Sequence, residues 1–100
     1  MSTSEPALEI SDDPVRHRFE AHVAGVLAGF VTYRRRPGEI IFDHTETEPG
    51  FEGRGVGSHL ARAVLEAARA EHLRVRPRCP FIAAYIERHP SYADLVAEPS

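Results

Sequence analysis

Apolar and polar residues alternate from Val15 to Val23, with the period of two that is typical of a strand with one buried face, and a near-continuously apolar run follows from Val26 to Val31. Two short turn sequences, Ala24-Gly25 and Pro37-Gly38, separate three strand-like segments of this region. Strands joined by such short turns pair as an antiparallel meander. The three strands predicted for this meander are Val15 to Val23, Val26 to Arg34 and Glu39 to Thr47.

The hydrophobic period changes after Pro49, where apolar residues begin to recur at the three- and four-residue spacing of one helical face. The pattern predicts a helix from about Gly55 to His72, followed by a short strand at Leu73 to Pro77. A strand, a helix and a strand in sequence normally form a right-handed crossover, so this strand is expected to lie parallel to the third. Pro80 suits the first turn of a second helix, predicted at about Pro80 to Arg88. The predicted fold class is therefore α/β.

The two ends of the chain carry weaker patterns. A short strand is predicted at Ala7 to Ile10, and Asp12-Asp13-Pro14 after it is typical of a turn. Tyr92, Leu95 and Val96 are expected to anchor part of an otherwise irregular C-terminal tail. One hundred residues are enough for one domain. We therefore predict a single domain over residues 1–100, with mobile tails at 1–6 and 97–100.

Three glycines, Gly53, Gly55 and Gly57, lie where a predicted strand gives way to a predicted helix. Glycine tolerates positive φ and lets backbone N–H groups approach an anion closely, and the helix dipole adds positive charge there. Their spacing fits neither the dinucleotide pattern G-x-G-x-x-G nor the lysine-containing phosphate loop. From the glycines alone, a phosphate-binding turn and a simple helix start are both open.

The segment from Glu52 to Gly57 resembles motif A of the GNAT acyltransferases, in which Gln or Arg, two residues, Gly, one residue and Gly or Ala follow one another. The resemblance extends to a minimal family of small, single-domain GNAT-like N-acetyltransferases, and it covers roughly Val15 to Val96. The further matching segments are His44-Thr45-Glu46, Phe51 to Leu60, Cys79-Pro80-Phe81, Tyr85-Ile86 and Arg88-His89-Pro90-Ser91-Tyr92.

This resemblance implies a compact GNAT-like fold, with an antiparallel meander, a βαβ crossover and a second, C-terminal helix. It also implies that acetyl-coenzyme A (acetyl-CoA) is the cosubstrate, with its pantetheine arm between the third and fourth strands. Glu52 departs from the motif, which has Gln or Arg at this position. An acid beside a pyrophosphate is repulsive unless its side chain points away. The residues expected to hold the pyrophosphate are Gly53, Arg54, Gly55, Val56, Gly57 and Ser58.

Acetyl transfer to an amine requires a neutral amine, stabilisation of an oxyanion and a proton for the leaving thiolate. Cys79, the only thiol, precedes a predicted helix whose N-terminus favours the thiolate. It is interpreted as a nucleophile that carries the acetyl group or as an acid that protonates the departing coenzyme A. A buried cysteine that merely packs is the third interpretation.

Two further residues are candidates for this chemistry. His44 is interpreted as a base or as a partner of Cys79, on the face of Ile40 and Phe42 if its strand is regular. A bulge in that strand would change which side chains face the cleft. Tyr85 lies where the resemblance implies a tyrosine that reprotonates the thiolate, although a buried aromatic residue with a satisfied hydroxyl is the more typical interpretation.

Charge and composition narrow the set of partners. The net charge of −3, with Arg34-Arg35-Arg36 as the only basic cluster, gives no reason to expect nucleic-acid binding. A single cysteine and scattered histidines predict no metal site. No apolar run approaches the ~20 residues that span a bilayer, so no membrane association is expected. Without the features of a signal peptide in the first residues, the predicted location is the cytoplasm.

The sequence is therefore compatible with three functions. The first is an acetyl-CoA-dependent N-acetyltransferase that acts on an unidentified amine. The second is a non-catalytic acyl-CoA-binding module, since a chain this small has little wall for an acceptor pocket. The third is an interaction domain without a ligand, in which the glycines only start a helix. The protein is expected to be a monomer or a homodimer.

Overall fold

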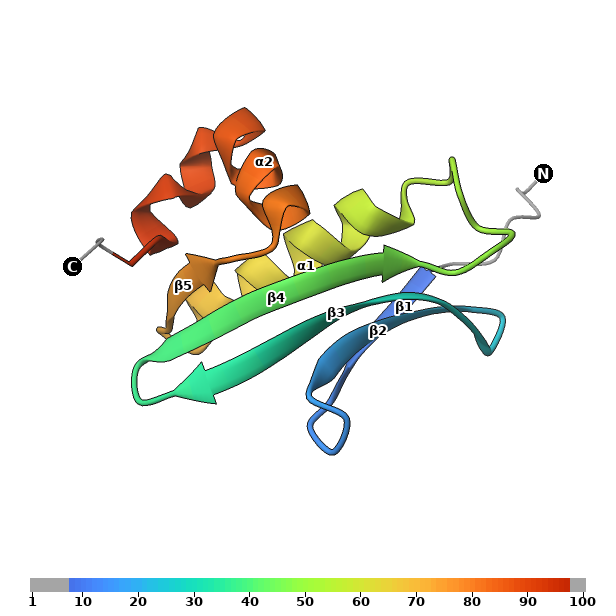
Figure 1. Cartoon of the computed structure of the whole chain (residues 1–100), viewed down its shortest axis with the longest axis horizontal. Coiled ribbons are helices and arrows are strands. Elements are labelled where there is room, and N and C mark those ends of the chain that lie inside the picture. The colour runs from blue at the N-terminus through green and yellow to red at the C-terminus, as the bar shows by residue number, and fades with distance from the viewer. Residues whose placement is uncertain (1–7, 98–100) are drawn as a thin grey trace.

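The computed structural model describes residues 8–97, which form a five-stranded sheet with two helices and a terminal 3₁₀ segment (Figure 1). The strands lie in the order β1-β2-β3-β4-β5; the first four pair antiparallel, and β5 pairs parallel to β4. The predicted α/β fold is confirmed. The elements are β1 (Leu8–Asp13), β2 (Arg18–Val23), β3 (Val26–Arg36), β4 (Glu39–Thr47), α1 (Val56–Ala70), β5 (Arg74–Pro77), α2 (Pro80–Arg88) and η1 (Pro90–Leu95).

The meander has four strands, because β1 pairs with β2 along its whole length. The predicted start of the second strand at Val15 is wrong: β2 begins at Arg18, and Val15 is 86% exposed in the preceding turn. The Asp13 carboxylate holds this turn by accepting hydrogen bonds from the backbone N–H groups of Val15 and Arg16. His17 has a left-handed φ of 56°, which ends the turn. Ala7 lies outside the described residues, as do 1–6 and 98–100 of the predicted tails.

A bulge divides the β3–β4 ladder into two halves. Thr32 lies opposite His44, whereas the next residue of β3, Tyr33, lies opposite Phe42, so Asp43 is the extra residue of β4. Neighbouring residues of a strand face opposite sides of a sheet, and directly paired residues share a side. Phe42 and His44 therefore face opposite sides, and the expectation that they share a face is wrong. A bulge shifts the alternation by one residue, which a pattern of period two cannot show.

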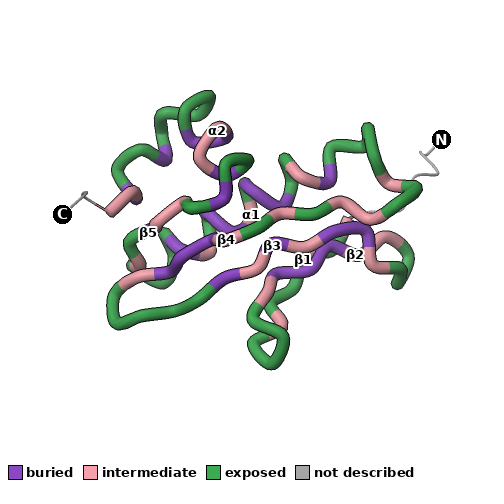
Figure 2. Tube along the Cα trace, viewed as in Figure 1, coloured by how far each residue is buried: buried purple, intermediate pink, exposed green. Residues whose placement is uncertain are grey.

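Both helices pack on one face of the sheet and form a single core with it (Figures 1 and 2). The apolar stripe of α1 is fully buried at Leu60, Val64 and Leu65. Each such side chain contributes about 1.5–3 kcal/mol on burial. Gly29 of β3 lets α1 approach closely, since a Cβ there would lie 2.6 Å from the Glu46 carbonyl oxygen and 2.9 Å from Val56 Cγ1. The start of α1 is thereby fixed against β3 and β4.

The segment after α2 is more ordered than the irregular tail expected there. It forms η1, in which Tyr92 and Leu95 are buried, as expected of anchoring residues. The Tyr92 hydroxyl donates to Glu66 Oε2 at 2.6 Å, and this carboxylate raises the pKa of the phenol. The Ala97 N–H donates to the Val75 carbonyl at 2.9 Å, which covers part of the outer edge of β5.

We expect Tyr92→Phe to lower the free energy of unfolding by about 1 kcal/mol, because the substitution removes the hydrogen bond to Glu66 and keeps the ring. Urea unfolding followed by circular dichroism measures this loss. An unchanged midpoint in the variant would show that the hydroxyl contributes nothing to the anchoring of η1.

Candidate functional site

The glycine-rich turn leads directly into α1 and leaves its N-terminus open. Gly53 and Gly55 have φ of 78° and 75°, in the left-handed region that favours glycine, and Gly55 is the N-cap residue. Within residues 8–97, no side chain caps the N-terminus of α1, and its first turn contains no acid. The first N–H groups of a helix have no partner inside the helix, and the dipole is positive there. The turn therefore has the geometry of an anion-binding site.

Glu52, which departs from the GNAT motif, folds back toward the strand side of the turn. Its Oε1 accepts a hydrogen bond from the backbone N–H of Gly50 at 2.9 Å. The neighbouring Arg54 is exposed, and its guanidinium lies 5.5 Å from the ring centroid of Phe51. The Glu52 carboxylate is thus engaged by a backbone N–H that precedes the helix.

The distal half of β4 has a strand partner on one side only. β5 pairs with β4 over Glu39–Phe42, and the Cys79 N–H then donates to the Phe42 carbonyl at 2.9 Å. Beyond that point the chain turns into α2, while β4 continues to Thr47 in its pairing with β3. Within the described residues, no strand therefore pairs with the outer edge of residues 43–47. Backbone groups at such an edge are available to an extended ligand that carries amides.

Cys79 lies at the junction of β5 and α2, beside this distal half of β4. It is the N-cap residue of α2, and it is 3% exposed. Its Sγ lies 3.3 Å from Oγ1 of Thr45, a hydrogen-bonding distance for a thiol and a hydroxyl. Thr45 belongs to the His-Thr-Glu segment but was not singled out from the sequence. The bulge at Asp43 turns Thr45 toward the helices, and the sequence pattern does not show this bulge.

His44 lies on the opposite side of the sheet from Cys79 and is exposed. Its Nε2 lies 3.1 Å from Glu46 Oε1, and its ring is 6.4 Å from the ring of Phe30 in an edge-on arrangement. Both neighbours come from the face that the helices leave uncovered. The structure therefore brings His44 together with Glu46 and separates it from the thiol, which favours a role as a base over a role as partner of Cys79.

Tyr85 lies further along α2 and packs toward the end of the chain. It is 6% exposed, its ring stacks on His89 with centroids 3.9 Å apart, and the ring of Tyr92 follows at 6.2 Å. Its described ring contacts are thus with the segment after α2. This surrounding is typical of an anchoring aromatic residue.

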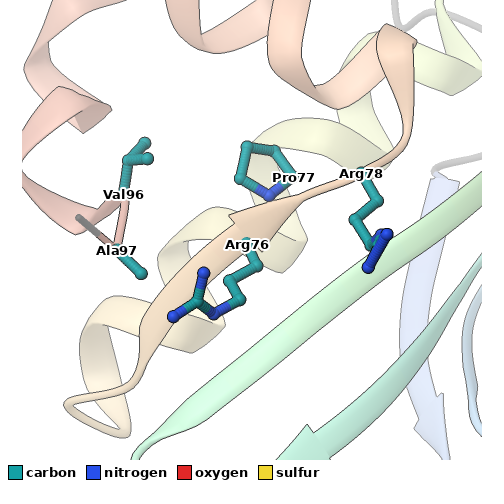
Figure 3. Close-up of a pocket in the computed structure, with 5 residues that line it drawn as sticks. All are labelled: Arg76, Pro77, Arg78, Val96 and Ala97. Carbon is teal, nitrogen blue, oxygen red and sulfur yellow. The ribbon is translucent and has the colours of Figure 1, made fainter. Parts of the chain in front are cut away.

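An open hollow of about 470 Å³ lies at the outer edge of β5 (Figure 3). It contains none of the residues predicted for catalysis or cofactor binding. Arg76 at this hollow pairs with Glu39 at 3.0 Å. The lining residues of the hollow are Arg76, Pro77, Arg78, Val96 and Ala97.

Among residues 8–97, no three His, Cys, Asp or Glu residues cluster as metal ligands. Neither helix in this range is long and apolar enough to cross a membrane.

Comparison with known protein families and proteins finds matches over most of the chain. Residues 18–95 match the family model described as GCN5-related N-acetyl-transferase. Protein NATD1 of Gallus gallus is 29% identical over 85 residues, which cover 83% of this chain and 77% of that protein. Protein NATD1 of Homo sapiens is also 29% identical over 85 residues, with coverage of 83% and 75%.

Two solved structures are similar to this one. A GCN5-like protein from Staphylococcus aureus, solved by NMR, superposes with a TM-score of 0.69 at 30% identity, over 93% of this chain and 91% of that one. A ribosomal-protein-alanine N-acetyltransferase from Brucella melitensis biovar Abortus 2308 superposes with a TM-score of 0.54 at 19% identity, over 83% and 62%. The second likeness concerns the fold alone.

Proposed function

This chain belongs to the GCN5-related N-acetyltransferase family, and we propose that it transfers the acetyl group of acetyl-CoA to an amine. One observation carries the proposal: the uncapped N-terminus of α1, entered through two left-handed glycines, lies beside the half of β4 that lacks a second strand partner. An anion site next to an open strand edge suits a ligand that has a pyrophosphate followed by an amide-bearing arm.

The residues of the turn would hold the pyrophosphate through the backbone. Free N–H groups in the first turn of α1 point along the helix axis toward an anion, and left-handed Gly53 and Gly55 leave room for its oxygens. Arg54 adds an exposed positive charge, and Ser58 adds a hydroxyl on the first turn. Backbone groups of residues 43–47 would then pair with the pantetheine amides.

When bound, acetyl-CoA supplies a thioester whose carbonyl accepts a nucleophile, and the chain supplies the proton transfers. His44 on the open face takes the proton from the incoming ammonium, and Glu46 at 3.1 Å orients its ring. Cys79 donates a proton to the leaving thiolate, with its Sγ held by the Thr45 hydroxyl. Tyr85 is the less favoured acid, because its ring packs on His89.

A second candidate function is an acyl-CoA-binding module without catalysis. The open hollow in Figure 3 is lined by neither Cys79 nor His44, so this hollow is not an acceptor pocket at the proposed catalytic residues. A small amine that docks on an open face needs no such pocket. The two functions share the cofactor site and differ only in turnover.

We expect thiol release from acetyl-CoA to accelerate when the protein is supplied with an accepted amine. A panel of primary amines, including polyamines, lysine derivatives and peptides with free N-termini, is followed with a thiol-reactive dye. The amine that gives turnover should gain the mass of one acetyl group. Tight binding of acetyl-CoA without turnover on the whole panel would favour the binding module instead.

A further inference from the structure

The glycines of the turn serve different needs. Gly53 and Gly55 require their missing side chains for backbone conformation, since both have left-handed φ. Gly57 is not in that region, but a Cβ at this position would lie 2.9 Å from Cζ and 3.2 Å from Cε2 of Phe81. Contacts under 3.0 Å force a shift. The small size of Gly57 is therefore used by a ring from the other helix.

The contact between Gly57 and Phe81 joins the first turns of the two helices. Gly57 is the second residue of α1, and Phe81 is the second residue of α2, two positions after Cys79. Phe81 is 38% exposed, although it is a large apolar residue. The ring lies between the start of the proposed pyrophosphate turn and the start of the helix that presents the thiol.

Cys79 is fixed from its other side by β4. Its N–H donates to the Phe42 carbonyl at 2.9 Å, and its Sγ contacts Thr45 Oγ1 at 3.3 Å. The distance between the Cys79 thiol and the glycine-rich turn then depends on how closely the first helical turn of α2 packs against α1. The Phe81 ring on Gly57 is a contact between these two first turns, and Gly57 offers backbone alone to the ring.

We propose that Phe81 is a positioning residue, which spaces the pyrophosphate turn from Cys79 by seating its ring on Gly57. This inference rests on the proposed function, because the turn and Cys79 are the proposed positions of the pyrophosphate and the thioester of acetyl-CoA. The affinity of a ligand that contacts both the turn and Cys79 depends on the distance between them. The affinity of a ligand that occupies the turn alone does not.

Gly57→Ala is the test, with binding measured by calorimetry for two ligands. One is acetyl-CoA, and the other is adenosine 3′-phosphate 5′-diphosphate, the nucleotide half that carries the pyrophosphate. The added methyl displaces the Phe81 ring, so acetyl-CoA should bind about ten-fold more weakly. The nucleotide half should lose much less affinity than acetyl-CoA, because alanine keeps the backbone N–H that Gly57 offers to the pyrophosphate.

The double variant Gly57→Ala, Phe81→Leu distinguishes this account from a direct role of Gly57. Leucine ends at its Cδ atoms and lacks the ring atoms that the new Cβ would meet, so it should restore most of the acetyl-CoA affinity. Melting temperatures of both variants check that each is folded. Equal weakening of both ligands without rescue would overturn the inference, because Gly57 would then be small for the pyrophosphate. Failure of the unsubstituted protein to bind acetyl-CoA would overturn the proposed function as well.

Discussion

Gly55→Ala is expected to weaken the binding of acetyl-CoA about 30-fold, or about 2 kcal/mol. Alanine at φ 75° is strained, so the turn relaxes and its N–H groups lose their alignment on the phosphates. Calorimetric titration of the variant measures the loss directly.

Gly25→Ala is the matched control for this substitution. Gly25 has a left-handed φ of 81°, lies in the turn between β2 and β3, and has nothing within 4 Å of an added Cβ. Both variants should lose a similar amount of stability, about 1 kcal/mol, from the same backbone strain. Only Gly55→Ala should lose affinity. Equal affinities in the two variants would remove the turn from the binding site.

Cys79→Ala is expected to lower kcat about 100-fold and to leave acetyl-CoA binding largely unchanged. The thiol is buried, and Thr45 holds it, which suits proton donation to the leaving thiolate. Thr45→Val should lower kcat in the same direction, because it removes the partner that orients Sγ. Steady-state kinetics of both variants, with the amine that gives turnover, measures these effects.

Mass spectrometry of the protein after incubation with acetyl-CoA separates the two catalytic roles of Cys79. An acid leaves the thiol unmodified, and this is the result we expect. An added acetyl mass at Cys79 would instead identify a nucleophile. Full activity of Cys79→Ala would exclude both roles and leave the cysteine as a core residue.

The sequence patterns predicted most of the architecture. The helical spacing of apolar residues identified α1, Pro80 marked the start of α2, and short turns bounded the strands β3 and β4. The glycine-rich turn marked the boundary between strand and helix. The matches to the family model and to the solved fold confirm the GNAT-like membership that the motifs indicated.

Residues whose orientation depends on a bulge or a turn were not predictable in this way. The bulge at Asp43 places His44 on the uncovered face and Thr45 against Cys79. No residue type in β4 indicates that a bulge occurs there. The Phe81 contact with Gly57 depends on the packing of two helices far apart in sequence. Such contacts arise from tertiary structure, and local patterns do not encode them.

Roles in catalysis and cofactor binding stay predictions for all the proposed site residues, as do the cytoplasmic location, the oligomeric state and the absence of nucleic-acid partners. The geometry groups these residues unequally. The turn, Cys79 and Thr45 lie toward the helices, His44 lies on the open face, and Tyr85 packs toward the C-terminal segment. Each variant above therefore tests a different part of the proposed site.

Calorimetric titration of acetyl-CoA into the unsubstituted protein tests whether the start of α1 binds the cofactor. We expect saturable binding at one site per chain, and competition by adenosine 3′-phosphate 5′-diphosphate, because the proposed site for the pyrophosphate is the start of α1. No heat of binding and no rise in melting temperature with acetyl-CoA at millimolar concentration would contradict it.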